Sequence, residues 1–122
     1  MIEFLKSTKI DKGWGYEEIL INRPEFCSKI LHYNKRGAKS SFHFHPIKKE
    51  CFKILCGTFS LSEKNERGQT QMTKLVKDDL IYIPNFASHQ LICLEDDSEI
   101  LEISTSHSDL DVIRIEPGDS QK

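Results

Sequence analysis

Apolar residues recur at every second position in short runs along most of the chain, and Gly, Pro, Asn and Asp separate these runs. A period of two places successive side chains on opposite faces of the backbone, which is the pattern of β-strands with one buried face. We therefore predict short strands at Trp14–Ile21, Phe26–Tyr33, Lys39–His45, Glu50–Cys56, Thr58–Ser62, Thr70–Val76, Asp79–Ile83, His89–Leu94, Glu99–Ser104 and Val112–Ile115.

The close spacing of these strands indicates an all-β protein built as a sandwich or a closed barrel, and closure would also remove exposed sheet edges. Only Ser106–Asp111 has the pattern of a helical turn. We predict a single domain over residues 1–122, with a core from about residue 12 to residue 116. The polar tail, 117–122, is expected to fray.

The composition excludes several classes of protein. The chain has 122 residues with 38% apolar and 30% charged side chains, so disordered and coiled-coil classes fit poorly. Its net charge of −2 argues against a nucleic-acid partner. The four cysteines form no CxxC pair, and no apolar run is long enough for a signal peptide or a membrane span. We expect a reduced, cytoplasmic protein that has no membrane partner.

Histidines on two predicted strands indicate a metal site. His43 and His45 are separated by one residue on a strand, so both rings leave the same face, about 7 Å apart at the backbone. Glu50 begins the next strand and His89 begins a later one. Three imidazoles and one carboxylate would hold one divalent transition metal (Zn, Mn, Fe or Ni) with open positions for a ligand.

The spacing of these residues resembles the first motif of the cupin family. Gly37-x5-His43-x-His45-x4-Glu50-x6-Gly57 matches that motif at every fixed position. The resemblance implies a double-stranded β-helix, the jelly-roll barrel of the cupin type. It also implies a metal inside the barrel.

The second cupin motif is matched in part. Asp78-x5-Pro84-x-Phe86-x2-His89 keeps the proline and the histidine, but Asp78 and Phe86 stand where the family usually has glycine, and Cys93 replaces the usual terminal Asn. A residue with a side chain resists positive φ, so the shape of the loop around Phe86 is the point at which this chain departs from the pattern.

Within the cupins, the chain is similar to the cupin domain of type II mannose-6-phosphate isomerases. The similarity lies in Lys12–Glu17, in His45-x2-Lys48-x-Glu50 and in Ser104–Glu116. It implies an aldose–ketose isomerase that acts on a sugar phosphate through a metal-stabilised enediol. The chain differs from that group at two places. His43 stands where the group commonly has Gln, and Glu116-Pro117-Gly118 stands in place of the group's usual C-terminal sequence.

Basic residues near the first motif are candidates for binding a sugar or sugar phosphate, namely Lys39, Lys48 and Arg114. The alternative for this basic cluster is a solvated rim. Lys48, His32 and Tyr82 are the candidates for the catalytic base, although His32 has an equally simple role in packing.

Two other functions stay open at this point. The first is a non-catalytic sugar-binding or regulatory cupin, and the second is an Fe(II)-dependent dioxygenase. We also expect a homodimer, because Phe42 and Phe44 alternate with the histidines and would face away from the barrel interior.

Overall fold

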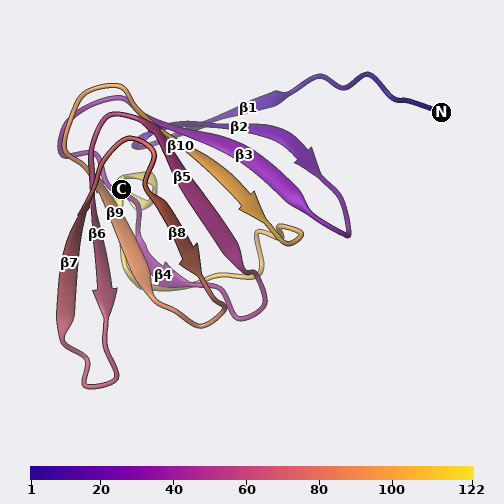
Figure 1. Ribbon diagram of the computed structural model, residues 1–122. Helices are drawn as coiled ribbons and strands as arrows, with labels where there is room; N and C mark the ends of the chain where they lie inside the picture. Colours follow the sequence, from indigo (N-terminus) through magenta and orange to yellow (C-terminus); the bar gives the residue numbers. More distant parts are fainter.

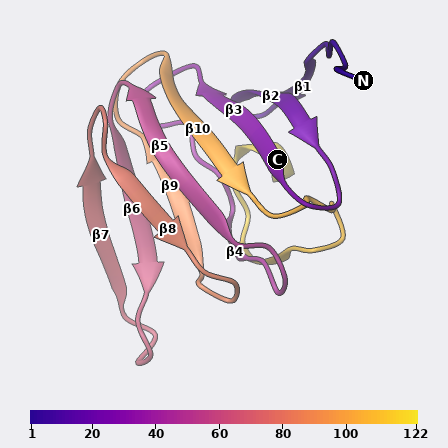
Figure 2. The ribbon, with the colours of Figure 1, turned by 45° about the vertical axis from the view of Figure 1, so that its right-hand side comes forward.

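Two antiparallel sheets face each other in the computed structural model, which describes residues 1–122 (Figure 1). The six-stranded sheet has the order β1-β2-β3-β10-β5-β8, and the five-stranded sheet has the order β11-β4-β9-β6-β7. Figure 2 shows β3, β10, β5 and β8 running side by side in one layer. The strands are β1 Thr8–Lys12, β2 Gly15–Asn22, β3 Cys27–Tyr33, β4 Phe42–Phe44, β5 Glu50–Cys56, β6 Phe59–Lys64, β7 Thr70–Leu75, β8 Leu80–Ile83, β9 His89–Cys93, β10 Ser98–Ser104 and β11 Ile113–Glu116.

The core lies between the two sheets, where alternate residues of each strand point inward. Cys27, Lys29, Leu31 and Tyr33 of β3 are buried, and the residues between them are only partly so. The main apolar cluster contains Trp14, Leu31, Tyr33, Phe52, Ile54, Phe59, Leu61, Leu75, Ile83, Leu91, Cys93 and Ile100. The predicted all-β jelly-roll architecture is confirmed.

Three segments differ from the sequence prediction. Strand β1 was not predicted, because its residues are almost all exposed and show no alternation of burial. Strand β4 is shorter than predicted, since Lys39 forms only an isolated bridge to Ile92. Residues 106–111 form turns and no helix. No helix in the chain has the length and apolarity that crossing a membrane requires.

The two positions where the second motif lacks glycine adopt positive φ all the same. Asp78 has φ 73° and Phe86 has φ 68°. The Asp78 N–H donates to the carbonyl of Ile54, and the Phe86 N–H donates to the carbonyl of His45, each at 2.9 Å. These bonds hold the turns in the left-handed region, so the loops keep their shape despite the side chains.

The C-terminal tail packs against the barrel, which differs from the predicted fraying. The Asp119 N–H donates to the carbonyl of Lys39 at 3.0 Å, and the Gly13 N–H donates to Oγ of Ser120 at 3.0 Å. A side chain at Gly118 would collide with the backbone of Ser40. In both ribbon views the N-terminal arm extends away from the sheets, while the C-terminus lies against them (Figures 1 and 2).

Candidate metal centre

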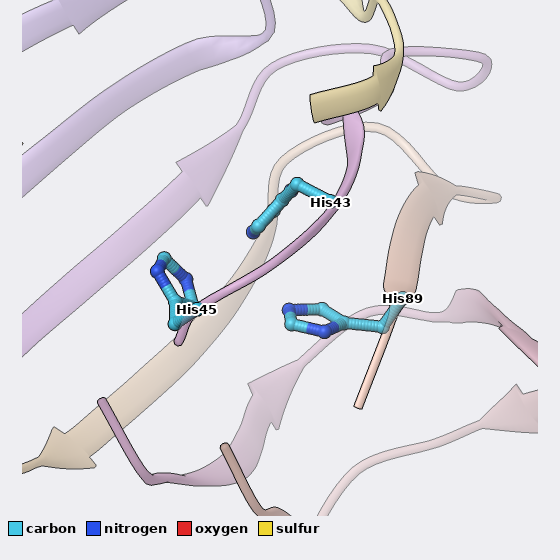
Figure 3. Close-up of side chains that lie close together, drawn as sticks. All are labelled: His43, His45 and His89. Atoms are coloured by element: carbon cyan, nitrogen blue, oxygen red, sulfur yellow. The ribbon is translucent and has the colours of Figure 1, made fainter. Parts of the chain in front are cut away.

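Three histidines converge at one end of the barrel interior. His43 and His45 come from β4 and the residue that follows it, and His89 begins the neighbouring strand β9, where it lies opposite His43. One nitrogen of each ring lies within 4.8 Å of the others. Figure 3 shows the three rings turned toward one another. This spacing suits nitrogen ligands that share one metal ion.

Each ring is oriented by a backbone carbonyl. Nδ1 of His43 donates to the carbonyl of Ser41 at 2.9 Å, and Nδ1 of His89 donates to that of Ala87 at 2.9 Å. Nδ1 of His45 donates to the carbonyl of Asp111 at 2.6 Å. With the proton on Nδ1, the lone pair of each ring is on Nε2, which is the arrangement found in metal-binding histidines.

Glu50 approaches the same point from β5 on the other sheet. Its Oε1 lies 3.4 Å from Nε2 of His45 and 3.6 Å from Nε2 of His89. This oxygen is buried and has no hydrogen-bond partner. A carboxylate oxygen in that state costs free energy unless something binds it. The donor set of three imidazoles and one orphaned carboxylate oxygen therefore fits a divalent metal ion.

The protonation states of these side chains also favour a cation. Burial, with the charges of His89 and His45, lowers the pKa of His43 to about 3. Burial also lowers the pKa of His89 to about 4. Burial and the neighbouring Glu102 raise the pKa of Glu50 to about 8. Near neutral pH the imidazoles are thus free bases, and a bound cation would favour the ionised form of Glu50.

Behind Glu50 lies a buried pair of opposite charges. Nζ of Lys48 is 2.7 Å from Oε2 of Glu102 and 3.5 Å from Oε2 of Glu50. Burial lowers the pKa of Lys48, but the two carboxylates outweigh it and raise that pKa above its ordinary value. Lys48 is therefore a fixed cation that holds one oxygen of Glu50 and leaves the other facing the histidines.

A cavity of about 410 Å³ opens beside the histidines. Its wall includes a second buried ion pair, in which Nζ of Lys29 lies 3.4 Å from Oε2 of Glu17. Trp14 also lines it and stacks on Tyr33 with ring centroids 4.2 Å apart. The cavity thus combines an aromatic surface with polar groups whose positions are fixed by pairing.

The buried charges of Lys29 and Glu102 were not predicted from the sequence. A signal for both was available in the strand period. Lys29 shares its parity with Leu31, and Glu102 shares its parity with Ile100, so each charged residue falls on the face that points inward. A charge at such a position is rare unless it is paired.

The structure brings some of the predicted ligand-binding residues to the cavity and leaves others outside it. Lys48 and Arg114 line the cavity, whereas Lys39 does not. His32 lies elsewhere, stacked on Tyr16 and within 2.8 Å of Oε2 of Glu99. Tyr82 is 63% exposed on the edge strand β8. Of the three candidate bases only Lys48 lines the cavity that holds the three histidines, and its raised pKa disfavours a role as a base.

Comparison with curated proteins gives two relatives of this chain. A probable oxalate decarboxylase from Arthroderma benhamiae is 33% identical over 101 residues, which are 80% of this chain and 24% of that protein. An oxalate decarboxylase from the same organism is 26% identical over 111 residues, or 88% of this chain and 25% of that protein. The chain spans about a quarter of the length of these relatives. No protein-family model matches it.

Solved structures with a similar backbone include an oxalate decarboxylase from Bacillus subtilis. It has a TM-score of 0.76 at 19% identity and covers 89% of this chain and 30% of its own. The Bacillus subtilis enzyme contains Mn(II) centres. The capsular polysaccharide assembling protein CapF from Staphylococcus aureus has a TM-score of 0.81 at 16% identity, covering 93% of this chain and 33% of its own.

Proposed function

Since the chain has the cupin fold and is related in sequence to oxalate decarboxylases, we propose that it is a metal-dependent cupin that acts on a small carboxylic acid. His43, His45, Glu50 and His89 would hold one divalent transition metal. When bound, such a metal supplies Lewis-acid polarisation of a ligand oxygen. The remaining residues of the cavity would orient the ligand and exclude water.

The observation that carries this proposal is the state of Glu50. Its Oε1 is buried without a hydrogen-bond partner and faces Nε2 of both His45 and His89. An ion pair with a protonated histidine would be the other way to satisfy this oxygen. The lowered pKa of His89 makes that pairing unfavourable near neutral pH. Without a cation Glu50 is held in its protonated form, whereas a divalent ion would use both its oxygen and the free Nε2 atoms of His45 and His89.

We propose Mn(II) as the first metal to test, because the Bacillus subtilis oxalate decarboxylase has Mn(II) centres. Zn, Fe and Ni are the other metals that suit three imidazoles and one carboxylate. The test is elemental analysis of protein purified without added metal, followed by electron paramagnetic resonance of Mn(II)-loaded protein. His45→Ala and His89→Ala should each lower the metal content well below one per chain.

His32→Ala is the matched control, because His32 is paired with Glu99 and lies outside the cavity. It should keep the full metal content. Retention of a full metal complement by both His45→Ala and His89→Ala would overturn the metal site.

The reaction is tested by carbon dioxide release from the metal-loaded protein. Oxalate is the first substrate to offer, because the relatives are oxalate decarboxylases. The cavity of about 410 Å³ has room for a longer molecule, so the panel should include dicarboxylates and 2-oxo acids with several carbon atoms. A metal-loaded protein that releases carbon dioxide from none of them would overturn this substrate class.

A sugar ligand is the second candidate, and the lining of the cavity favours it. Trp14 adds an aromatic side chain to the wall, and the pair of Lys29 and Glu17 offers both donors and acceptors for hydroxyl groups. The comparisons give no support for mannose-6-phosphate isomerase in particular. The test for an isomerase is exchange of the C2 proton of mannose 6-phosphate or fructose 6-phosphate with deuterated solvent. Uptake of dioxygen with the same panel of substrates would instead indicate an Fe(II)-dependent dioxygenase.

A non-catalytic cupin would behave differently from either enzyme. It would bind a sugar or an acid at the cavity and turn over neither. Calorimetric titration of the metal-loaded protein against the same panel separates this case, because binding would be seen without product.

A further inference from the structure

Four cationic side chains line the cavity, and three of them are paired. Lys12 lies 3.8 Å from Oε1 of Glu17, Lys29 lies 3.4 Å from Oε2 of the same residue, and Lys48 lies 2.7 Å from Oε2 of Glu102. Arg114 has no acidic group within ion-pairing distance. It is therefore the cavity's one cation that is free to bind an anionic ligand.

Arg114 also lies close to the metal centre. It is on β11, where it pairs in register with His43 of β4. A candidate metal ligand and an unpaired guanidinium therefore lie at paired positions of two adjacent strands. A guanidinium presents donors in a planar fork, which suits the paired oxygens of a carboxylate or a phosphate.

Two neutral residues of the C-terminal tail line the same cavity, and their acceptor atoms are already used. Oγ of Ser120 accepts the Gly13 N–H at 3.0 Å, and Oε1 of Gln121 accepts the Gly118 N–H at 2.8 Å. The Ser120 hydroxyl proton and the Gln121 amide protons have no partner within the chain. Both residues thus offer donors to the cavity.

We infer that Arg114, Ser120 and Gln121 form an oxyanion subsite, which binds a carboxylate or phosphate group of the ligand other than the group at the metal. The inference rests on the proposed function, because it describes the far end of a ligand whose other end lies at the histidines. It assigns the C-terminal segment a direct part in ligand choice. A ligand with one anionic group at each end, or one at a distance from its reacting group, fits this arrangement.

The subsite is tested with two probes, inorganic phosphate and succinate, which separate the two sources of oxyanion. Binding is measured by isothermal titration calorimetry with both metal-loaded and chelator-treated protein. Arg114→Ala should weaken binding of the preferred probe about tenfold or more in both forms, as expected for a charge-assisted contact. Gln121→Ala and Ser120→Ala should weaken it by smaller factors.

Arg67→Ala is the matched control, because Arg67 is an exposed arginine in the β6–β7 hairpin and does not line the cavity. It should bind both probes as the unmodified protein does. Arg114 is itself exposed, so its substitution should leave the melting temperature unchanged, and this is measured on the same samples.

Two outcomes separate failure of this inference from failure of the proposed function. If Arg114→Ala keeps its metal content and binds phosphate and succinate as tightly as the unmodified protein, the subsite is overturned and the metal site stands. The second outcome is that the unmodified protein holds no metal, while the chelator-treated Arg114→Ala variant binds anions more weakly than the chelator-treated unmodified protein. In that case the subsite stands and the metal proposal fails.

Discussion

The backbone carbonyl of Asp111 accepts a hydrogen bond from Nδ1 of His45 at 2.6 Å, across 66 positions of sequence. The carboxylate of the same residue accepts the N–H groups of Ile47 and Lys48, each at 2.9 Å. Asp111 therefore fixes both the ring of His45 and the turn that leads to Glu50. Two elements of the candidate metal centre depend on one residue outside it.

Replacing Asp111 with alanine should release the turn that follows His45. Two hydrogen bonds to a charged acceptor are lost, so the free energy of unfolding should fall by about 2–4 kcal/mol. Alanine keeps the backbone carbonyl that binds His45, but the released turn no longer fixes that carbonyl or Glu50 in place. Metal affinity should therefore fall about 10- to 100-fold. Asp96→Ala is the control, since Asp96 accepts only the exposed Arg36 N–H. Unchanged metal affinity in Asp111→Ala would contradict the assigned role.

Lys48 should matter more for folding and for the metal than for binding phosphate. Lys48→Met leaves Glu102 and Glu50 buried without their cation, so the free energy of unfolding should fall by about 3–5 kcal/mol. Lys53→Met is the control, because Lys53 is half exposed and lies 3.9 Å from Asp78. Chemical denaturation of both variants measures the difference. A Lys48→Met protein as stable as the unmodified chain would show that the buried pair contributes nothing.

The metal-free protein should be most stable near pH 6.5. Folding depresses the pKa values of His43 and His89, so the unfolded chain binds protons more readily than the folded one. The contribution of these histidines to the free energy of unfolding is therefore complete above pH 6.5 and is lost as the pH falls toward 4. Each group changes the free energy of unfolding by up to about 1.4 kcal/mol per pH unit. Folding raises the pKa of Glu50, so its contribution is complete below pH 4.5 and is lost as the pH rises toward 8.

Between pH 4.5 and 6.5 the two histidines outweigh the one carboxyl group, and above pH 6.5 the carboxyl group acts alone. Thermal melts of chelator-treated protein from pH 4 to pH 8 measure this profile. Glu50→Gln should remove the decline between pH 6.5 and 8 and leave the decline at lower pH. A decline above pH 6.5 that persists in Glu50→Gln would have another source.

We expect the protein to form a homodimer. Phe42, one basis of that prediction, is only 3% exposed, and Nζ of Lys64 lies 5.2 Å from its ring centroid. The N-terminal arm is the stronger argument, because Ile2 and Phe4 are 88% and 97% exposed. Light scattering should give twice the chain mass of 14.1 kDa. Phe4→Ser should lower the measured mass toward that of a single chain. Leu110→Ser, at an equally exposed apolar residue, should not.

The grouping of His43, His45 and Glu50 could be predicted because strand parity and short sequence spacing are local features. A strand period of two puts both rings on one face, and a short turn returns Glu50 toward them. Lys39 has the same parity as His43 and His45, which would place it in the cavity as well. It does not line the cavity, because parity holds only within a regular strand and β4 begins after Lys39.

The C-terminal wall of the cavity could not be predicted from local pattern. Residues 117–122 are polar and contain Pro and Gly, which is also the composition of a frayed end. Their order comes from contacts with distant residues, such as the bond between Gly13 and Ser120. A sequence pattern carries no information on which distant backbone groups a tail will meet.

The dependence of His45 on Asp111, together with the pairing of β4 and β11, has a consequence for the order in which the protein is made. A ribosome releases His43 and His45 into solution long before it adds residues 111–116. Domains acquire their structure as synthesis proceeds from the N-terminus, but this site cannot take its final form until residues 111–116 have emerged. Metal capture is therefore a late event, and a nascent chain stalled before Asp111 should not retain the ion.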